Sequence, residues 1–143
     1  MEQQVMVELQ TTIEDNGEKE YNTTKNLGKL FEKNRRTVLM YEESLDDQSL
    51  IKTLITIQPD KVTINRSGVV SMNQKFLEKQ LTENIYKHPH GNFNMETYTH
   101  SIKHEIDRTT KSGRLTIHYT VKLNGQNERK HDLILTYTKE DVQ

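Results

Sequence analysis

Arg66 is the residue whose type and position best suit the binding of a ligand. It follows Val62 and Ile64 at every second position, and the alternation of a β-strand therefore directs its guanidinium toward the interior. The planar fork of donors on an arginine matches a carboxylate or a phosphate. We predict that Arg66, together with Gln74 and Arg114, binds a small molecule. The alternative is that protein carbonyls or a glutamate satisfy Arg66, because burying an unpaired guanidinium costs several kcal/mol.

Other side chains are expected to face the same interior. The segments that follow Gly68 and Pro89 each alternate in polarity, and the face expected to point inward carries both apolar and hydroxyl side chains. A polar or amphipathic ligand would suit such a lining, whereas a filled interior would make the same residues a core. The residues predicted to line it are Met72, Phe76, Phe93, Met95, Thr97, Thr99, Leu115, Ile117 and Tyr119.

The histidines are candidate metal ligands. His88 and His90 would lie about 6.6 Å apart on one face of a strand and could hold an ion if a third ligand approached. His100 and His104 would be about 13 Å apart on a strand, too far to share a metal. His118 should face solvent. The chain has no cysteine, which excludes thiolate zinc sites, and we expect surface histidines with no metal and no cofactor.

No catalytic motif is present. The sequence lacks the G-x-S-x-G, H-E-x-x-H, P-loop and G-x-G-x-x-G patterns. Glu42-Glu43 and Asp46-Asp47 are paired carboxylates, but they fall in an acidic stretch and are expected to be solvated. We expect a protein that is not an enzyme, and we rank an unrecognised enzyme last among the alternatives.

Bulk composition limits the class of protein. The 143 residues suit one domain, spanning residues 1–143. Hydrophobic residues make up only 31%, so the core is thin or the interior is partly polar. A net charge of -1 argues against disorder and against a basic nucleic-acid footprint. The basic run of residues 33–36 is expected to lie in a hairpin turn.

Targeting signals are not visible. The first residues lack a basic segment followed by an apolar one, so we expect no signal peptide. No apolar run approaches the ~20 residues of a membrane span. We therefore expect a cytoplasmic protein that contacts neither membrane nor nucleic acid. The sequence does not indicate an oligomeric state.

Period-two patterning dominates the chain. Residues 5–13 and 115–123 alternate apolar and polar side chains, and each stretch is followed by an Asn-Gly hairpin signal. Short connections imply antiparallel neighbours. Closing the sheet would remove its unpaired edges. We predict an all-β fold, a closed or nearly closed up-and-down barrel of about eight to ten strands.

Three stretches are irregular. Leu77, Leu81 and Ile85 recur every four residues, which locally indicates an amphipathic helix over residues 75–86, although two strands joined by a turn remain an alternative. Gly28 suggests a bulge or bend in its strand. The apolar parity also shifts after Tyr98, as a β-bulge would allow.

The cluster Arg66-Ser67-Gly68 and Met72-Asn73-Gln74 is the most specific pattern in the chain. On these residues, and over nearly its whole length, the chain resembles the YwiB-like family of uncharacterised bacterial proteins. The resemblance implies a calycin-like, lipocalin-like barrel in a bacterial cytoplasm, and it favours two strands over residues 75–86. It brings no established activity, so it implies no catalytic residue. The further residues that carry it are Phe76, Gly91, Phe93, Met95, Thr97, Gly113, Arg114, Leu115, Ile117 and Tyr119.

The sequence predicts two alternative functions. The first is a binding module for a small polar or amphipathic ligand, with Arg66 at its centre. The second is a structural or protein-interaction barrel whose interior is filled. A cavity of about 300 Å³ or more that Arg66 and Gln74 reach would favour the first.

Overall fold

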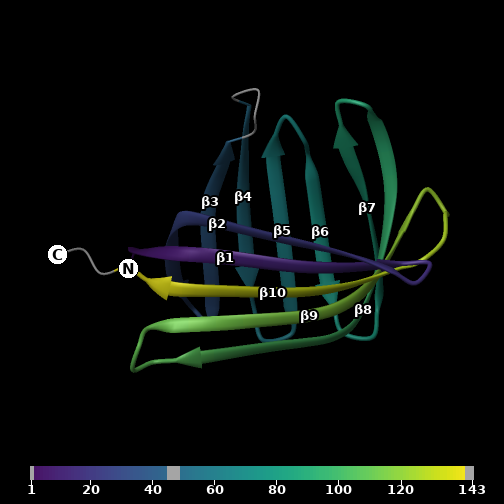
Figure 1. Cartoon of the computed structure of the whole chain (residues 1–143). Helices are drawn as coiled ribbons and strands as arrows, with labels where there is room; N and C mark the ends of the chain where they lie inside the picture. The colour runs from purple at the N-terminus through teal and green to yellow at the C-terminus, as the bar shows by residue number, and fades with distance from the viewer. Residues whose placement is uncertain (1, 45–48, 141–143) are drawn as a thin grey trace.

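A computed structural model of the chain describes residues 2–44 and 49–140. These residues form ten strands arranged as a nearly closed barrel (Figure 1). The strands are β1 (Glu2–Asp15), β2 (Glu18–Lys33), β3 (Arg36–Ser44), β4 (Leu50–Ile57), β5 (Lys61–Gly68), β6 (Met72–Leu77), β7 (Leu81–His88), β8 (Gly91–Asp107), β9 (Ser112–Leu123) and β10 (Arg129–Lys139). The predicted all-β barrel is confirmed.

The strands form one antiparallel meander. Their order in the sheet is β6-β5-β4-β3-β2-β1-β10-β9-β8-β7. Strands β3 to β7 cross the layer that contains β1, β9 and β10, so the barrel is flattened into two facing layers (Figure 1). The long strand β8 pairs with β7 through residues 91–98 and with β9 through residues 95–107. The part of the chain that is described contains no helix with the length and hydropathy of a membrane span.

The barrel is incompletely closed between β6 and β7. Ser71 and Lys87 exchange backbone hydrogen bonds of 2.9 and 2.8 Å at one end of this seam. At the other end, the turn between the strands donates a bond to the carbonyl of Thr99. Between them, the Thr82 hydroxyl donates to the carbonyl of Lys75 at 2.6 Å. Short bridges and side chains therefore complete the wall.

Apolar side chains fill the centre of the barrel. They come from both layers because each strand directs alternate residues inward. The Phe76 ring packs edge-on against Tyr119, with ring centroids 4.8 Å apart. Any ligand site must therefore lie toward an end of the barrel. The apolar residues at most 2% exposed are Val5, Val7, Leu30, Leu39, Ile55, Ile57, Val62, Phe76, Leu115, Ile117, Leu135 and Tyr137.

Residues 75–86 form two strands and a turn, as the family resemblance implied. The period-four apolar residues lie outside the barrel, with Leu81 and Ile85 57% and 58% exposed. The inward face of β7 is mostly polar, and its apolar residues face outward. This reverses the usual arrangement of a strand and produced the four-residue apolar spacing that indicated a helix. The bulge expected after Tyr98 is confirmed by a register shift between Thr99 and Ser101.

Gly28 does not form a bulge. Its strand pairs with β1 and β3 without a register shift. The glycine is required by crowding, because a Cβ there would lie 2.7 Å from the carbonyl oxygen of Met40. Of the two alternatives predicted here, a bulge or a bend, the bulge is wrong, because a tight approach between strands gives the same sequence signal.

Candidate functional site

Polar side chains cross three adjacent strands at one level of the barrel. Tyr41 on β3 pairs with Thr53 on β4, and Thr53 pairs with Arg66 on β5. Val62 and Ile64, which precede Arg66 on the same face, are buried, so Arg66 continues the inward side of its strand. The prediction that its guanidinium faces inward is confirmed.

Arg66 is paired with a carboxylate. Its Nη2 lies 3.4 Å from Oε1 of Glu43, and the two side chains are 30% and 17% exposed. Glu43 was expected to be solvated with its neighbours, and this expectation was wrong because β3 continues to Ser44 and directs Glu43 inward. Asp46 and Asp47 lie outside the described residues. The pair is neutral overall, so the site carries no net positive charge for an anion.

Tyr41 supplies a hydrogen-bond donor next to this pair. Burial and the nearby carboxylate of Glu43 raise the pKa of its phenol to about 12, although Arg66 opposes the shift. The phenol therefore keeps its proton at neutral pH and cannot serve as a base there.

Two amides face the seam between β6 and β7. Gln74 is 6% exposed and donates a 2.9 Å hydrogen bond to the hydroxyl of Thr97. Extending the Ser71–Lys87 pairing along both strands places Gln74 opposite Asn84. Both polar atoms of the Asn84 carboxamide are buried and have no hydrogen-bond partner among the described residues. We call Tyr41, Glu43, Thr53, Arg66, Gln74, Asn84 and Thr97 the inner polar cluster.

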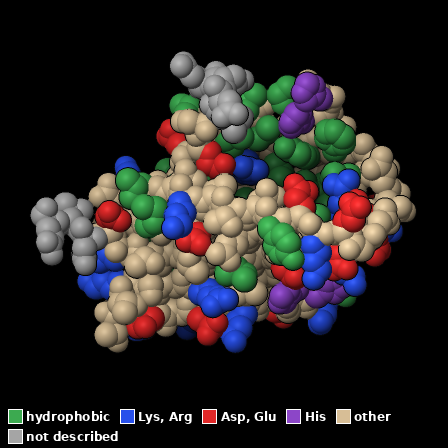
Figure 2. Space-filling view, in the orientation of Figure 1, with side chains coloured by type: hydrophobic (Ala, Val, Ile, Leu, Met, Phe, Trp, Pro, Cys, Tyr) green, Lys and Arg blue, Asp and Glu red, His purple; other side chains and the backbone are tan. Residues whose placement is uncertain are grey.

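The apolar neighbours of the cluster are only partly buried. Met72 pairs with Arg66, and Tyr86 pairs with Phe93, with their ring centroids 6.2 Å apart. These three side chains are only partly buried, unlike those of the filled centre. The molecule is hollowed on its upper side, where hydrophobic side chains and a basic one line the opening (Figure 2). The upper ends of β5, β6 and β7 lie at this side (Figure 1).

Residues 7–135 match a family described as a domain of unknown function (DUF1934). The chain belongs to the DUF1934 family. A relative named "Uncharacterized beta-barrel protein YwiB", from Bacillus subtilis (strain 168), is 29% identical over 133 residues, which cover 93% of this chain and 92% of that protein.

A solved structure agrees with the fold of this DUF1934 barrel. The crystal structure of the ywiB protein from Bacillus subtilis superposes with a TM-score of 0.86 at 28% identity, covering 98% of this chain and 94% of that chain. The family resemblance and the barrel fold inferred from the sequence are therefore confirmed.

Several residues predicted to line a site instead belong to the packed centre of the DUF1934 barrel. Phe76 is fully buried, and Met95 and Tyr119 are 5% and 6% exposed. Burial raises the pKa of the Tyr119 phenol well above its usual range. Met72 and Phe93 are only partly buried, and Met72 pairs with Arg66.

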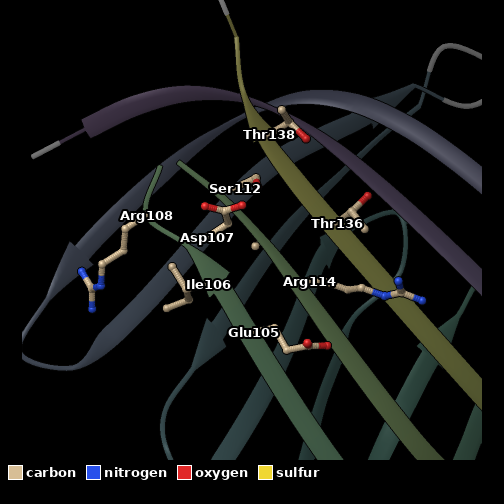
Figure 3. A pocket seen from close by; sticks show the side chains of 9 residues that line it. Glu105, Ile106, Asp107, Arg108, Ser112, Arg114, Thr136 and Thr138 are labelled. Atoms are coloured by element: carbon tan, nitrogen blue, oxygen red, sulfur yellow. The ribbon is translucent and has the colours of Figure 1, made fainter. Parts of the chain in front are cut away.

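Arg114 lies apart from the other predicted residues. It is exposed on the outer face of β9, where it pairs with Glu105 and Thr136. The close-up shows its guanidinium extending over β10 beside Thr136, at a surface depression of about 580 Å³ (Figure 3). Alternation assigns it outward because Gly113 and Leu115 take the inward positions. Arg114 therefore does not join Arg66.

Four residues of the inner polar cluster were not predicted from the sequence: Tyr41, Glu43, Thr53 and Asn84. A signal existed for two of them, because Leu39, Tyr41 and Glu43 follow the same alternation on β3. For Asn84 the signal was inverted, since its apolar neighbours on β7 face outward. An apolar residue is normally assigned to the inside.

Two of the histidines lie close together without a third ligand among the described residues. The rings of His88 and His90 lie 5.1 Å apart, but the described residues contain no group of three or more His, Cys, Asp or Glu placed to hold an ion. His118 is exposed, as expected, and hydrogen-bonds to Asp132.

Breaking the Arg66–Glu43 pair should be destabilising, and removing both partners should be milder. We expect Arg66→Met to lower the free energy of unfolding by about 2 kcal/mol, because it leaves a largely buried carboxylate unpaired. The double variant Arg66→Met/Glu43→Leu should recover most of this loss. Urea unfolding of the wild-type protein, Arg66→Met, Glu43→Leu and the double variant measures the coupling free energy between the two side chains. Additive effects would show that the pair contributes nothing.

Proposed function

We propose that this protein binds a small neutral polar or amphipathic molecule at the inner polar cluster. The observation that supports this most directly is the Asn84 carboxamide, whose two polar atoms are buried without a partner among the described residues. An unsatisfied buried polar group costs about 1–3 kcal/mol. A ligand that pairs with both atoms would offset this cost.

The cluster favours a particular ligand chemistry. A carboxamide offers a donor and an acceptor side by side, which complement an amide, lactam or ureide group. Because Glu43 already neutralises Arg66, a strongly anionic ligand would have to displace an existing ion pair. The partly buried Met72, Tyr86 and Phe93 would contact the apolar part of the ligand. Tyr41 keeps its proton at neutral pH and Glu43 is already paired with Arg66, so we propose binding without catalysis.

Native mass spectrometry of the protein purified from its natural host tests the proposal. A bound molecule should appear as a discrete added mass that is lost on denaturation. The wild-type protein should carry it, and Asn84→Leu should not.

Asn84→Leu should also stabilise the unliganded protein. Leucine has a similar size and carries no buried polar atoms, so we expect the free energy of unfolding to rise by about 1 kcal/mol. Chemical unfolding of protein refolded from denaturant measures this without interference from a retained ligand. A loss of stability in Asn84→Leu, together with no added mass on the wild-type protein, would contradict the proposal.

A filled structural or interaction barrel is the second candidate. It is favoured by the closely packed centre, where Phe76, Leu115 and Leu135 are each 0% exposed. The absence of any retained molecule in the mass spectrum would support this candidate.

A further inference from the structure

We infer that the opposite end of the barrel holds a second binding site, for a small organic anion with an apolar body. The basic mouth, as we name it, comprises Lys33, Arg35, Arg36 and Arg108 around Ile57, Ile102, His104 and Ile106. These residues line one cavity of about 590 Å³. That volume lies within the ~300–1,000 Å³ typical of small-molecule sites.

The cavity lies at a mouth of the barrel. The turns between β2 and β3 and between β4 and β5 form one side, and the end of β8 forms the other. Ile57 is 2% exposed, and Ile102 pairs with the inward residue Ile117. The apolar floor therefore continues the core, whereas the rim is open to solvent. The inner polar cluster lies at the far ends of β3 and β5, so the two sites have no residue in common.

The rim has unpaired positive charge. Four of its side chains are cationic, and Glu32 is the one carboxylate among the residues that line the cavity. Within the described ranges, none of the four cations forms an ion pair. Guanidinium groups bind carboxylates and phosphates through paired hydrogen bonds. The rim is thus suited to the head of an anion whose apolar part lies on the isoleucines.

The histidine on the floor is held in place. The His104 ring nitrogen Nε2 lies 2.9 Å from the Tyr137 hydroxyl. Tyr137 covers Gly113, where a Cβ atom would lie 2.1 Å from the tyrosine ring. The floor is therefore fixed by packing before a ligand binds, which reduces the entropy lost on binding.

Arg35 occupies a position that favours glycine. The chain makes the same kind of turn at Asn16-Gly17, with φ of 53° and 83°, and at Asn124-Gly125, with φ of 52° and 71°. The third such turn is Asn34-Arg35, with φ of 52° and 65°. A side chain other than glycine is disfavoured at the second position. The backbone is therefore strained at Arg35, the residue that adds a guanidinium to the cavity rim. Backbone strain that is retained in a fold often marks a functional position.

The concave shape favours a small ligand over a membrane surface. The cations surround a cavity with an apolar floor, so an anion can be contacted from both sides. A phosphate or carboxylate head could belong to a free metabolite or to a lipid. The experiment must separate these two sources.

Isothermal titration calorimetry with decanoate, octyl phosphate and inorganic phosphate tests the site. We expect the two amphipathic anions to bind the wild-type protein, with an affinity that falls as salt rises. Arg35→Gly should weaken this affinity by about tenfold or more, through loss of a charge-assisted hydrogen bond. The same variant should raise Tm by about 3–5 °C, because the turn strain is relieved.

Two variants are matched controls. Arg35→Lys keeps both the charge and the strained position but loses the paired hydrogen bonds of the guanidinium, so its Tm should match wild type while its affinity falls between those of wild type and Arg35→Gly. Gly17→Arg introduces the strain in the β1–β2 turn, where a Cβ meets nothing within 4 Å, and should lower Tm without changing the affinity.

Several results would overturn the inference. No binding of either amphipathic anion, or equal affinity in Arg35→Gly and wild type, would refute the site. Equal affinity for inorganic phosphate and octyl phosphate would refute a role for the apolar floor. Binding to vesicles of anionic phospholipid, without binding to the monomeric anions, would show that the mouth is a membrane-contacting surface instead.

Discussion

Replacing Gly68 by alanine is expected to lower the free energy of unfolding by about 3–5 kcal/mol. Gly68 has a φ of +124°, a conformation that side chains other than glycine rarely adopt. A Cβ atom there would also lie 2.3 Å from the carbonyl oxygen of Leu50 on the neighbouring strand. Backbone atoms cannot move aside as a flexible side chain can, so β4 and β5 must separate locally.

The local separation of β4 and β5 in Gly68→Ala should also disturb the inner polar cluster. Gly68 pairs with Ile51 at the end of β5, and the next inward pair along these strands is Thr53 with Arg66. Separation of the strands would shift Arg66 relative to Glu43. We therefore expect Gly68→Ala to lose any bound ligand as well as stability.

Gly91→Ala is the matched control. Its φ is +139°, but a Cβ atom there meets nothing within 4 Å. This variant reports the backbone strain alone, about 1–3 kcal/mol. Urea unfolding of both variants measures the difference. Equal losses in the two would mean that the contact with Leu50 relaxes without cost.

Part of the site could be predicted from the sequence because two positions on β5 depend only on local geometry. Alternation from Val62 through Ile64 fixes the direction of Arg66, and only glycine fits two residues later. Local patterning thus places both residues on their strand. It does not show that Glu43 is the partner of Arg66, because the ion pair joins strands β3 and β5, which are separated in the sheet by β4.

Other features depend on contacts that period-two patterning does not encode. On β7, Leu81 and Ile85 face outward while Asn84 faces inward. A sequence reading that places apolar residues inside cannot find such a strand. Arg35 looked like an ordinary basic turn residue, and only the arrangement of β2, β4 and β8 around it shows that it lines a cavity.

Acid should destabilise the barrel through His131. This residue stacks on Tyr119, with ring centroids 4.9 Å apart, and its Nε2 is buried without a partner among the described residues. Burial, and secondarily Arg129, lower the pKa of His131 from 6.5 to about 4, although Asp132 opposes the shift. Between about pH 4 and pH 6.5, His131 therefore stays neutral in the folded protein but becomes protonated in the unfolded chain.

The sign and size of the effect follow from this difference in pKa. Above about pH 6.5 the histidine is neutral in both states, and its contribution to stability is fully present. As the pH falls from 6.5 toward 4, the unfolded state gains the proton first and stability is lost. Below the folded pKa no further loss arises from this group. A lowering of this size corresponds to a loss on the order of 3 kcal/mol.

His131→Phe isolates the contribution of the histidine, because phenylalanine keeps a ring on Tyr119 but cannot be protonated. Urea unfolding at pH 7 and pH 4.5 should show the wild-type protein losing about 2–3 kcal/mol more than the variant. Burial also lowers the pKa of His104, so the variant should retain a smaller acid sensitivity of the same sign. Carboxylates titrate in both proteins and cancel in the comparison. Equal losses in the two proteins would mean that His131 accepts a proton inside the fold, and that the interior of β10 is wetter than its packing against Tyr119 indicates.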